Sequence, residues 1–250
     1  MKTKVLSLCA LAVAGAFAAV PASATMTGSV GLGVHAYDLG YKDTDAVVYP
    51  IPAINVETEH FYFKGLEAGA FLFKNERHRV MLGVSYMPWS FDASDSDHAG
   101  MKKLDDRDAS FFANATYAFD TGFGLLTASL GADISGKSEG MMSEVSFMKR
   151  FAFGQFGITP QVGAIWTSEK FNEYYYGVSH AEANRSGLSA YSPDAGVSPY
   201  VRLMGDWQMG NNWSLYAETT VRAMSKEIKD SPMVEDDAVV GFGVGVSYRF

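Results

Sequence analysis

Cysteine and long apolar runs are both scarce in this 250-residue sequence. The single cysteine, Cys9, lies within the N-terminal apolar run from Val5 to Val20. Leu8 precedes it where a lipoprotein signal needs a small residue, so we do not expect lipidation. Beyond residue 24 no apolar run approaches the roughly 20 residues that a membrane-spanning helix needs. The mature chain therefore has neither disulfides nor transmembrane helices, and any membrane role must come from strands.

The first 24 residues have the three-part layout of a secretory signal peptide. Lys2 and Lys4 precede the apolar run, and Pro21-Ala22-Ser23-Ala24 ends it with a small-residue cleavage site. We expect cleavage after Ala24, which gives a signal peptide over 1–24 and one exported domain over 25–250.

Positive charge is also limited, with 20 basic residues against 28 acidic ones. Removing residues 1–24 takes away two lysines and no acid, which leaves 18 basic residues and a formal charge of −10. This balance excludes a general affinity for nucleic acid.

Motifs that carry catalysis or bind metals are missing as well. There is no G-x-S-x-G elbow, and the five histidines show no metal-ligand spacing. Asp97-His98, in an acidic segment, faintly resembles the acid and histidine pairs of outer-membrane proteases, but as a single loop dipeptide it is better explained as part of a solvated acidic loop. We expect no enzymatic activity, no metal site and no cofactor.

The signal that is present is a two-residue alternation in runs of about ten residues, the length of a tilted strand that crosses a membrane. From Ala109 to Phe119 the odd positions are apolar and the even ones mostly polar, and 124–135, 197–207 and 213–223 repeat the pattern. Weaker runs cover 28–38, 47–58, 59–73, 78–89, 142–153 and 157–167. Lys149 breaks one of them, which calls for a bulge or for snorkelling at an interface.

Connections between these runs alternate in length. Short turns are expected at 75–77, 120–122, 154–155 and 210–212, and long polar ones at 90–108, 136–141, 168–196 and 225–236. The chain also ends on a strand that closes with Phe250, as outer-membrane barrels do. Together these features predict an all-β, antiparallel transmembrane β-barrel in the outer membrane, with short periplasmic turns and longer extracellular loops. Strand direction gives 12 strands if the short segment His60 to Lys64 spans, and ten if it does not.

The lumen-facing positions are expected to carry a nearly balanced set of charges. In a narrow barrel such a set favours ion pairs across the interior over a selective pore. The set is Arg79, Asp133, Glu144, Arg150, Arg202, Asp206, Glu218, Arg222 and Arg249. Inward glycines, among them Gly243 and Gly245, leave room for long neighbouring side chains or relieve strand twist.

Several segments resemble the MipA/OmpV family along essentially the whole mature chain. The most specific is YYYGVSHAEANRSGLSAYSPDAGV over 174–197. Tyr49-Pro50-Ile51-Pro52, Phe61-Tyr62-Phe63-Lys64-Gly65, Leu104-x-Asp106-Arg107-Asp108-Ala109 and Ser247-Tyr248-Arg249-Phe250 accompany it.

The resemblance implies a scaffold that binds a murein lytic transglycosylase and a bifunctional penicillin-binding protein, in contact with outer-membrane lipid and lipopolysaccharide. We expect a monomer. The alternatives are a small-solute channel and a surface adhesin that acts through the loop 168–196. Residues expected to make contacts in that loop are Tyr174, Tyr175, Tyr176, Glu182, Arg185 and Tyr191.

Overall fold

A computed structural model describes residues 26–250, so the predicted signal peptide lies outside the described residues. The described chain is dominated by strands that form one sheet. The strands are β1 (Thr27–Tyr37), β2 (Val47–Pro52), β3 (Asn55–Glu57), β4 (Phe61–Lys64), β5 (Glu67–Lys74), β6 (His78–Met87), β7 (Ser110–Asp120), β8 (Leu125–Asp133), β9 (Met141–Met148), β10 (Phe151–Phe153), β11 (Phe156–Thr167), β12 (Gly196–Met209), β13 (Trp213–Ala223) and β14 (Ala238–Arg249).

The sheet closes on itself as an antiparallel barrel. β14 pairs with β1 from Ser29↔Arg249 to Tyr37↔Gly241, and every other wall strand pairs with its neighbours in sequence. β2 and β3 both pair with β1 and together count as one strand of the wall. In the same way, β9 and β10 both pair with β11 and count as one strand. The wall therefore has 12 strands, and the short β4 completes the count as expected.

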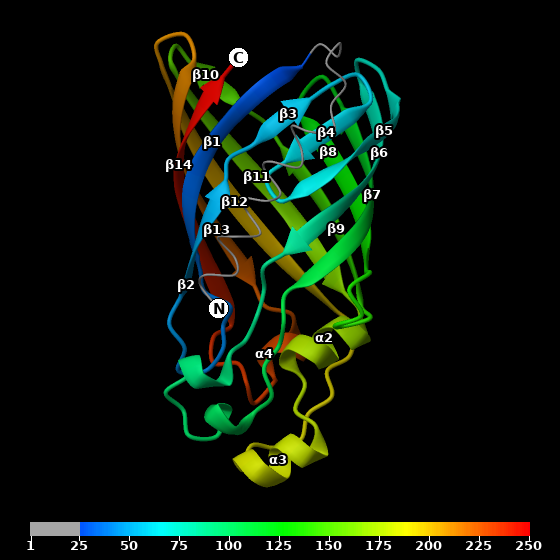
Figure 1. Ribbon diagram of the computed structural model, residues 1–250, viewed down its shortest axis with the longest axis vertical. Helices are drawn as coiled ribbons and strands as arrows, with labels where there is room; N and C mark the ends of the chain where they lie inside the picture. The colour runs from blue at the N-terminus through cyan, green and yellow to red at the C-terminus, as the bar shows by residue number, and fades with distance from the viewer. Residues whose placement is uncertain (1–25) are drawn as a thin grey trace.

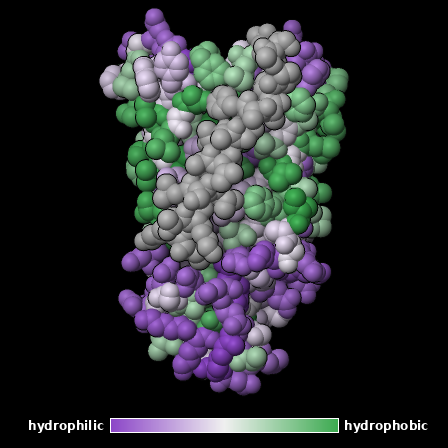
Figure 2. All heavy atoms as spheres, in the orientation of Figure 1, coloured by the Kyte–Doolittle hydropathy of each residue, from purple (hydrophilic) through white to green (hydrophobic). Residues whose placement is uncertain are grey.

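Alternation places the apolar side chains outside. Outward residues such as Leu203 and Val201 on β12 are 49% and 54% exposed, which is what a lipid-facing surface requires. Figure 2 shows hydrophobic residues along both sides of the barrel part of the molecule and a hydrophilic lower end. Among the described residues, no helix has the length and apolar character to cross a membrane.

Lys149 does not cause a bulge. The pairs Met148↔Gln161 and Phe151↔Ile158 keep the same register on either side of it. Its ammonium lies 3.4 Å from the centroid of the Phe123 ring, a cation–π contact that fits the other interpretation, a lysine that snorkels to the interface. The register shift lies instead in β5, between Phe71 and Phe73.

The long connections gather at one end of the barrel, and the short turns predicted at 75–77, 120–122, 154–155 and 210–212 lie at the other (Figure 1). We call the first group the cap, which comprises residues 38–46, 88–109, 134–140, 168–195 and 224–237. It holds the short helices η1 (Ala93–Asp95), η2 (Met101–Lys103), α2 (Glu169–Tyr176), α3 (His180–Ser186) and α4 (Lys226–Lys229). The turns at the opposite end, together with Phe250, form the periplasmic rim.

Charge is divided sharply between the two parts. The cap holds 19 of the 28 acidic residues and 9 basic ones, whereas the rest of the described chain holds 9 of each sign. The net negative charge of the described chain is thus carried by the cap alone.

Inward glycines lie beside flat rings from neighbouring strands. A Cβ added to Gly243 would lie 2.6 Å from the His35 ring, and one added to Gly245 would lie 2.5 Å from Tyr216. These glycines therefore make room for large neighbouring side chains, one of the two roles expected for them.

β2 is an exposed edge within the wall. It pairs with β1 alone, because the β4–β5 hairpin turns at Gly65 (φ +57°) before it can reach β2. Pro50 and Pro52 have no backbone N–H group, so they cannot donate hydrogen bonds to another strand. The Tyr49 hydroxyl bridges the gap by donating to the carbonyl oxygen of Pro88 at 3.2 Å.

Candidate functional site: a cap above a polar lumen

The cap has a hydrophobic core of its own, which seals the extracellular mouth. Met101, Phe171, Tyr175 and Met233 come from three different loops and are completely buried. They pack in the same cluster as Phe112, which points inward from β7. Because this cluster joins the loops to the inner wall, the loops pack together over the barrel mouth, and α3 extends beyond it (Figure 1).

α2 supplies much of this core. Ser168 caps its N-terminus by accepting a hydrogen bond from the Phe171 N–H. The Tyr175 hydroxyl lies 2.9 Å from Ser110 Oγ and donates to the Asp108 carbonyl oxygen at 3.0 Å. Tyr175 and Tyr176, expected as contact residues, are instead interior residues of the cap, because loops from other parts of the chain pack over both rings.

We expect Tyr175→Phe to destabilise the folded cap by about 1–3 kcal/mol, because the change leaves the buried Ser110 hydroxyl without the Tyr175 hydroxyl as its partner. Limited proteolysis of the folded protein, followed during heating, measures the effect. Tyr174→Phe is the matched control: its hydroxyl accepts only from the exposed Asp108 N–H, and its loss should cost less than about 1 kcal/mol. Equal cleavage of both variants would contradict this account.

α3 begins with a capping box. Ser179 Oγ accepts from the Glu182 N–H, and the Glu182 carboxylate accepts from the Ser179 N–H. The same carboxylate binds Arg107 at 2.8 Å, with side chains 4% and 8% exposed. Burial alone raises the Glu182 pKa, but hydrogen bonds from Arg107, Ser179 and the Asp105 N–H outweigh it and hold the pKa at about 2.

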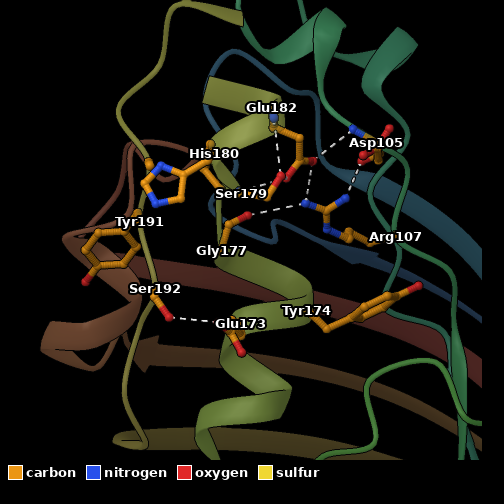
Figure 3. Close-up of a pocket in the computed structure, with 12 residues that line it drawn as sticks. Asp105, Arg107, Glu173, Tyr174, Gly177, Ser179, His180, Glu182, Tyr191 and Ser192 are labelled. Atoms are coloured by element: carbon orange, nitrogen blue, oxygen red, sulfur yellow. Dashed lines mark hydrogen bonds and ion pairs between the residues drawn. The ribbon is translucent and has the colours of Figure 1, made fainter. Parts of the chain in front are cut away.

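An outer pocket of about 790 Å³ lies over this ion pair (Figure 3). Tyr174, Glu182 and Tyr191, all expected as contacts, line it together with Glu173 and His180. Arg185 does not line the pocket; its Nη2 atom lies 2.5 Å from Asp105 Oδ1. The six predicted residues thus divide into three that line a surface pocket, two that are buried and one that ties α3 to another loop.

A second cavity, of about 460 Å³, occupies the lumen below the cap. Its walls are hydroxyl, amide, methionine and charged side chains, with Ser129, Asn114 and Gln161 among them. Lys64 and Arg79, toward the periplasmic rim, are 38% and 36% exposed, so solvent reaches the cavity from that side. The lumen is a cup that opens toward the periplasm.

Within the predicted charge set, Arg150 and Asp206 pair at 2.6 Å. Glu218 lies 3.3 Å from His35 Nδ1, and Arg79 lies 3.7 Å from Glu57. Neither His35 nor Glu57 belonged to the set, although both lie on the inward parity of their strands, which is the signal that could have identified them.

The other five members have neutral partners or partners in the backbone. Glu144 accepts from the Tyr200 hydroxyl, and Arg202 donates to Thr220 and Gln161. Arg222 stacks on the Trp89 ring at 4.4 Å, and Asp133 accepts from residues of the 135–139 turn. Arg249 contributes its backbone carbonyl to Asn212. Tyrosines and hydroxyls, rather than opposite charges, surround most of these groups.

The Asp97-His98 dipeptide has a local structural explanation. His98 Nδ1 accepts from the N–H groups of Gly100 and Met101 and so starts the η2 turn. Asp97 is almost fully exposed and lies 3.6 Å from Lys102. The pair therefore helps to shape a surface loop.

The whole barrel matches one protein family. The model of the family described as MltA-interacting protein MipA matches residues 30–250. The MltA-interacting protein of Escherichia coli K12 is 37% identical over 245 residues, which cover 98% of this chain and 99% of that protein.

Other similar proteins are named for the outer membrane. The putative outer membrane protein YiaT of E. coli K12 is 33% identical over 93% of this chain and 96% of its own length. The outer membrane protein OmpV of Vibrio cholerae is 25% identical over 71% of this chain and 69% of its own. Among solved structures, an outer membrane channel of Pseudomonas putida F1 superposes with a TM-score of 0.43 at 12% identity, covering 93% of this chain and 97% of that one.

Proposed function

This chain belongs to the family of MltA-interacting protein MipA, and from that membership we propose that it anchors a murein lytic transglycosylase at the inner surface of the outer membrane. The protein is an outer-membrane β-barrel. In this proposal it acts without catalysis of its own and brings the transglycosylase to a penicillin-binding protein. The acidic cap faces lipopolysaccharide on the other side.

One observation supports this role over that of an open channel. The buried core around Met101, Phe171 and Met233 fills the extracellular mouth, so the lumen does not pass straight through the molecule. A periplasmic enzyme can meet only the periplasmic rim and the open end of the lumen.

The rim offers a small surface. Its turns are short, and their exposed side chains include Glu59, His60, Glu76 and Arg77. A partner must therefore touch several turns at once and bury an area at the low end of specific interfaces, below about 1,200 Å². We expect a transient contact.

The test is affinity capture from detergent-solubilised envelopes with the full protein as bait. We expect the transglycosylase and a penicillin-binding protein to be enriched by the natural protein. Combining Glu59→Lys, Glu76→Lys and Arg77→Glu should reduce capture about tenfold, equivalent to roughly 1.4 kcal/mol spread over three rim charges. The turn at Asn75 should persist, because its side chain binds only the backbone N–H groups of Arg77 and His78.

Asp236→Lys is the matched control, since it reverses one exposed charge on the cap. Capture by this variant should equal that of the natural protein. The proposal fails if neither enzyme is enriched, or if the cap and rim variants lose capture equally.

A further inference from the structure

We propose that the lumen is a binding cup for a small glycan–peptide that carries carboxylate and amine groups, such as a murein fragment released beside the barrel. The cup itself follows from the structure of the lumen, whereas the choice of a murein fragment as its occupant rests on the proposed function. The two can therefore be tested separately.

The shape of the lumen fits a ligand rather than a passing solute. The cap closes one end and the other opens toward the periplasm. A volume of about 460 Å³ lies within the range of small-molecule sites, which is roughly 300–1,000 Å³. A single sugar bearing a short peptide is a molecule of suitable size.

The cup presents charges of both signs that lack ion partners. Within the described residues, no carboxylate oxygen lies within 4.0 Å of the Arg202 guanidinium, which donates only to Thr220 Oγ1 at 3.0 Å and Gln161 Oε1 at 3.5 Å. Glu67 accepts from the Tyr62 hydroxyl at 2.5 Å, and Glu144 from Tyr200. Charges in an enclosed space are stabilised by opposite charges, so a ligand with both an acid and an amine complements this wall.

A buried hydroxyl points to the same cavity. Thr159, on β11 and facing inward, is 6% exposed, and its Oγ1 has no hydrogen-bond partner among residues 26–250. Such groups are rare because burying an unpaired hydroxyl costs about 1–3 kcal/mol. Thr159 lines the cavity with Gln161, Ser146 and Thr127, and its Oγ1 is closed to solvent in the ligand-free structure. In the proposed complex the Thr159 side chain rotates, so that its hydroxyl meets a polar group of the ligand.

Thr159→Val separates ligand binding from folding. Valine keeps the shape and removes the unpartnered oxygen, so the folded protein without ligand should unfold at the same temperature as the natural one or higher. Affinity for the ligand should nevertheless fall about 3- to 10-fold, because a hydrogen bond made only in the complex is lost. A merely structural threonine would not give these opposite effects.

The measurement is isothermal calorimetry on the full protein in detergent, with N-acetylmuramoyl tripeptide ending in diaminopimelate as the probe. We expect saturable binding, weakened about tenfold or more by Arg202→Gln, since hydrogen bonds to charged groups are the stronger ones. Neutral N-acetylglucosamine should bind more weakly than the probe.

Thr219→Val, on the lipid-facing side of β13, is the matched control and should bind like the natural protein. Absence of saturable binding, equal affinity of the Thr159→Val variant, or equal binding of the neutral sugar would overturn the proposal. Calorimetry needs no protein partner, so failed enzyme capture with intact probe binding would refute the anchor alone.

Discussion

Arg107→Met should open the cap. The change leaves the buried Glu182 carboxylate without its cation, and breaking a buried pair in this way costs about 3–5 kcal/mol. Because Arg107 also donates to the carbonyl oxygens of Asp105 and Gly177, three loop contacts are lost together. We expect rapid protease cleavage within 168–196 on intact cells, and ion conductance in planar bilayers that the natural protein lacks.

The double variant Arg107→Met with Glu182→Leu should close the cap again, since apolar side chains of similar volume replace buried ion pairs at little cost. Cleavage and conductance should then return toward natural levels. A single variant that stays closed would show that the hydrophobic core alone seals the mouth.

Acid should have the same effect as the single variant. Glu182 has a pKa of about 2 in the folded cap and 4.5 when unpaired. The contribution of the ionised Glu182 carboxylate to the stability of the cap is therefore complete above pH 4.5 and is lost as the pH falls toward 2. This contribution amounts to at most about 3 kcal/mol. Conductance that rises across this window, and does not rise in the double variant, would attribute the opening to Glu182.

Gly31→Val should prevent the barrel from closing. A Cβ at Gly31 would lie 2.0 Å from the carbonyl oxygen of Val246, in the seam where β1 meets β14. The obstacle is backbone rather than a flexible side chain, so the strands must separate. We expect the free energy of unfolding to fall by about 3 kcal/mol or more, which is the upper end of the cost of overpacking. The folded band in unheated electrophoresis should disappear.

Gly205→Ala is the matched control, because a Cβ there meets nothing within 4 Å on the lipid-facing side of β12. This variant should fold like the natural protein. A folded Gly31→Val barrel with unchanged mobility would mean that the seam yields more than the close contact suggests.

The barrel wall was predictable because a two-residue alternation records which way each side chain faces. β7 and β12 show this: most of their apolar residues face outward, whereas Phe112 faces inward and joins the core of the cap. The bulge at Leu72 was not predictable, since Leu72 and Phe73 are both apolar and both face outward, which conceals the register shift.

The cap was largely hidden from sequence patterns. Its helices are too short for helical periodicity, although Ser168 and the Ser179-x-x-Glu182 capping box mark two of their starts. Its core depends on contacts between loops far apart in the chain, such as the ring contact of Tyr41 with Tyr176. The local sequence pattern cannot predict which of the three consecutive tyrosines at 174–176 are buried, because their burial depends on the loops that pack over them.

The uneven distribution of charge gives the molecule two electrostatic characters. The acidic residues that lower the isoelectric point of the whole sequence to about 5.1 are concentrated in the cap, while the rest of the described chain is neutral. A protein that approaches the periplasmic rim meets no long-range field from net charge. Association there should proceed without electrostatic steering, at a rate of about 10⁵–10⁶ M⁻¹s⁻¹ that changes little with ionic strength. Neighbouring copies, in contrast, repel one another through their outer ends at low salt, which spaces them apart in the plane of the membrane.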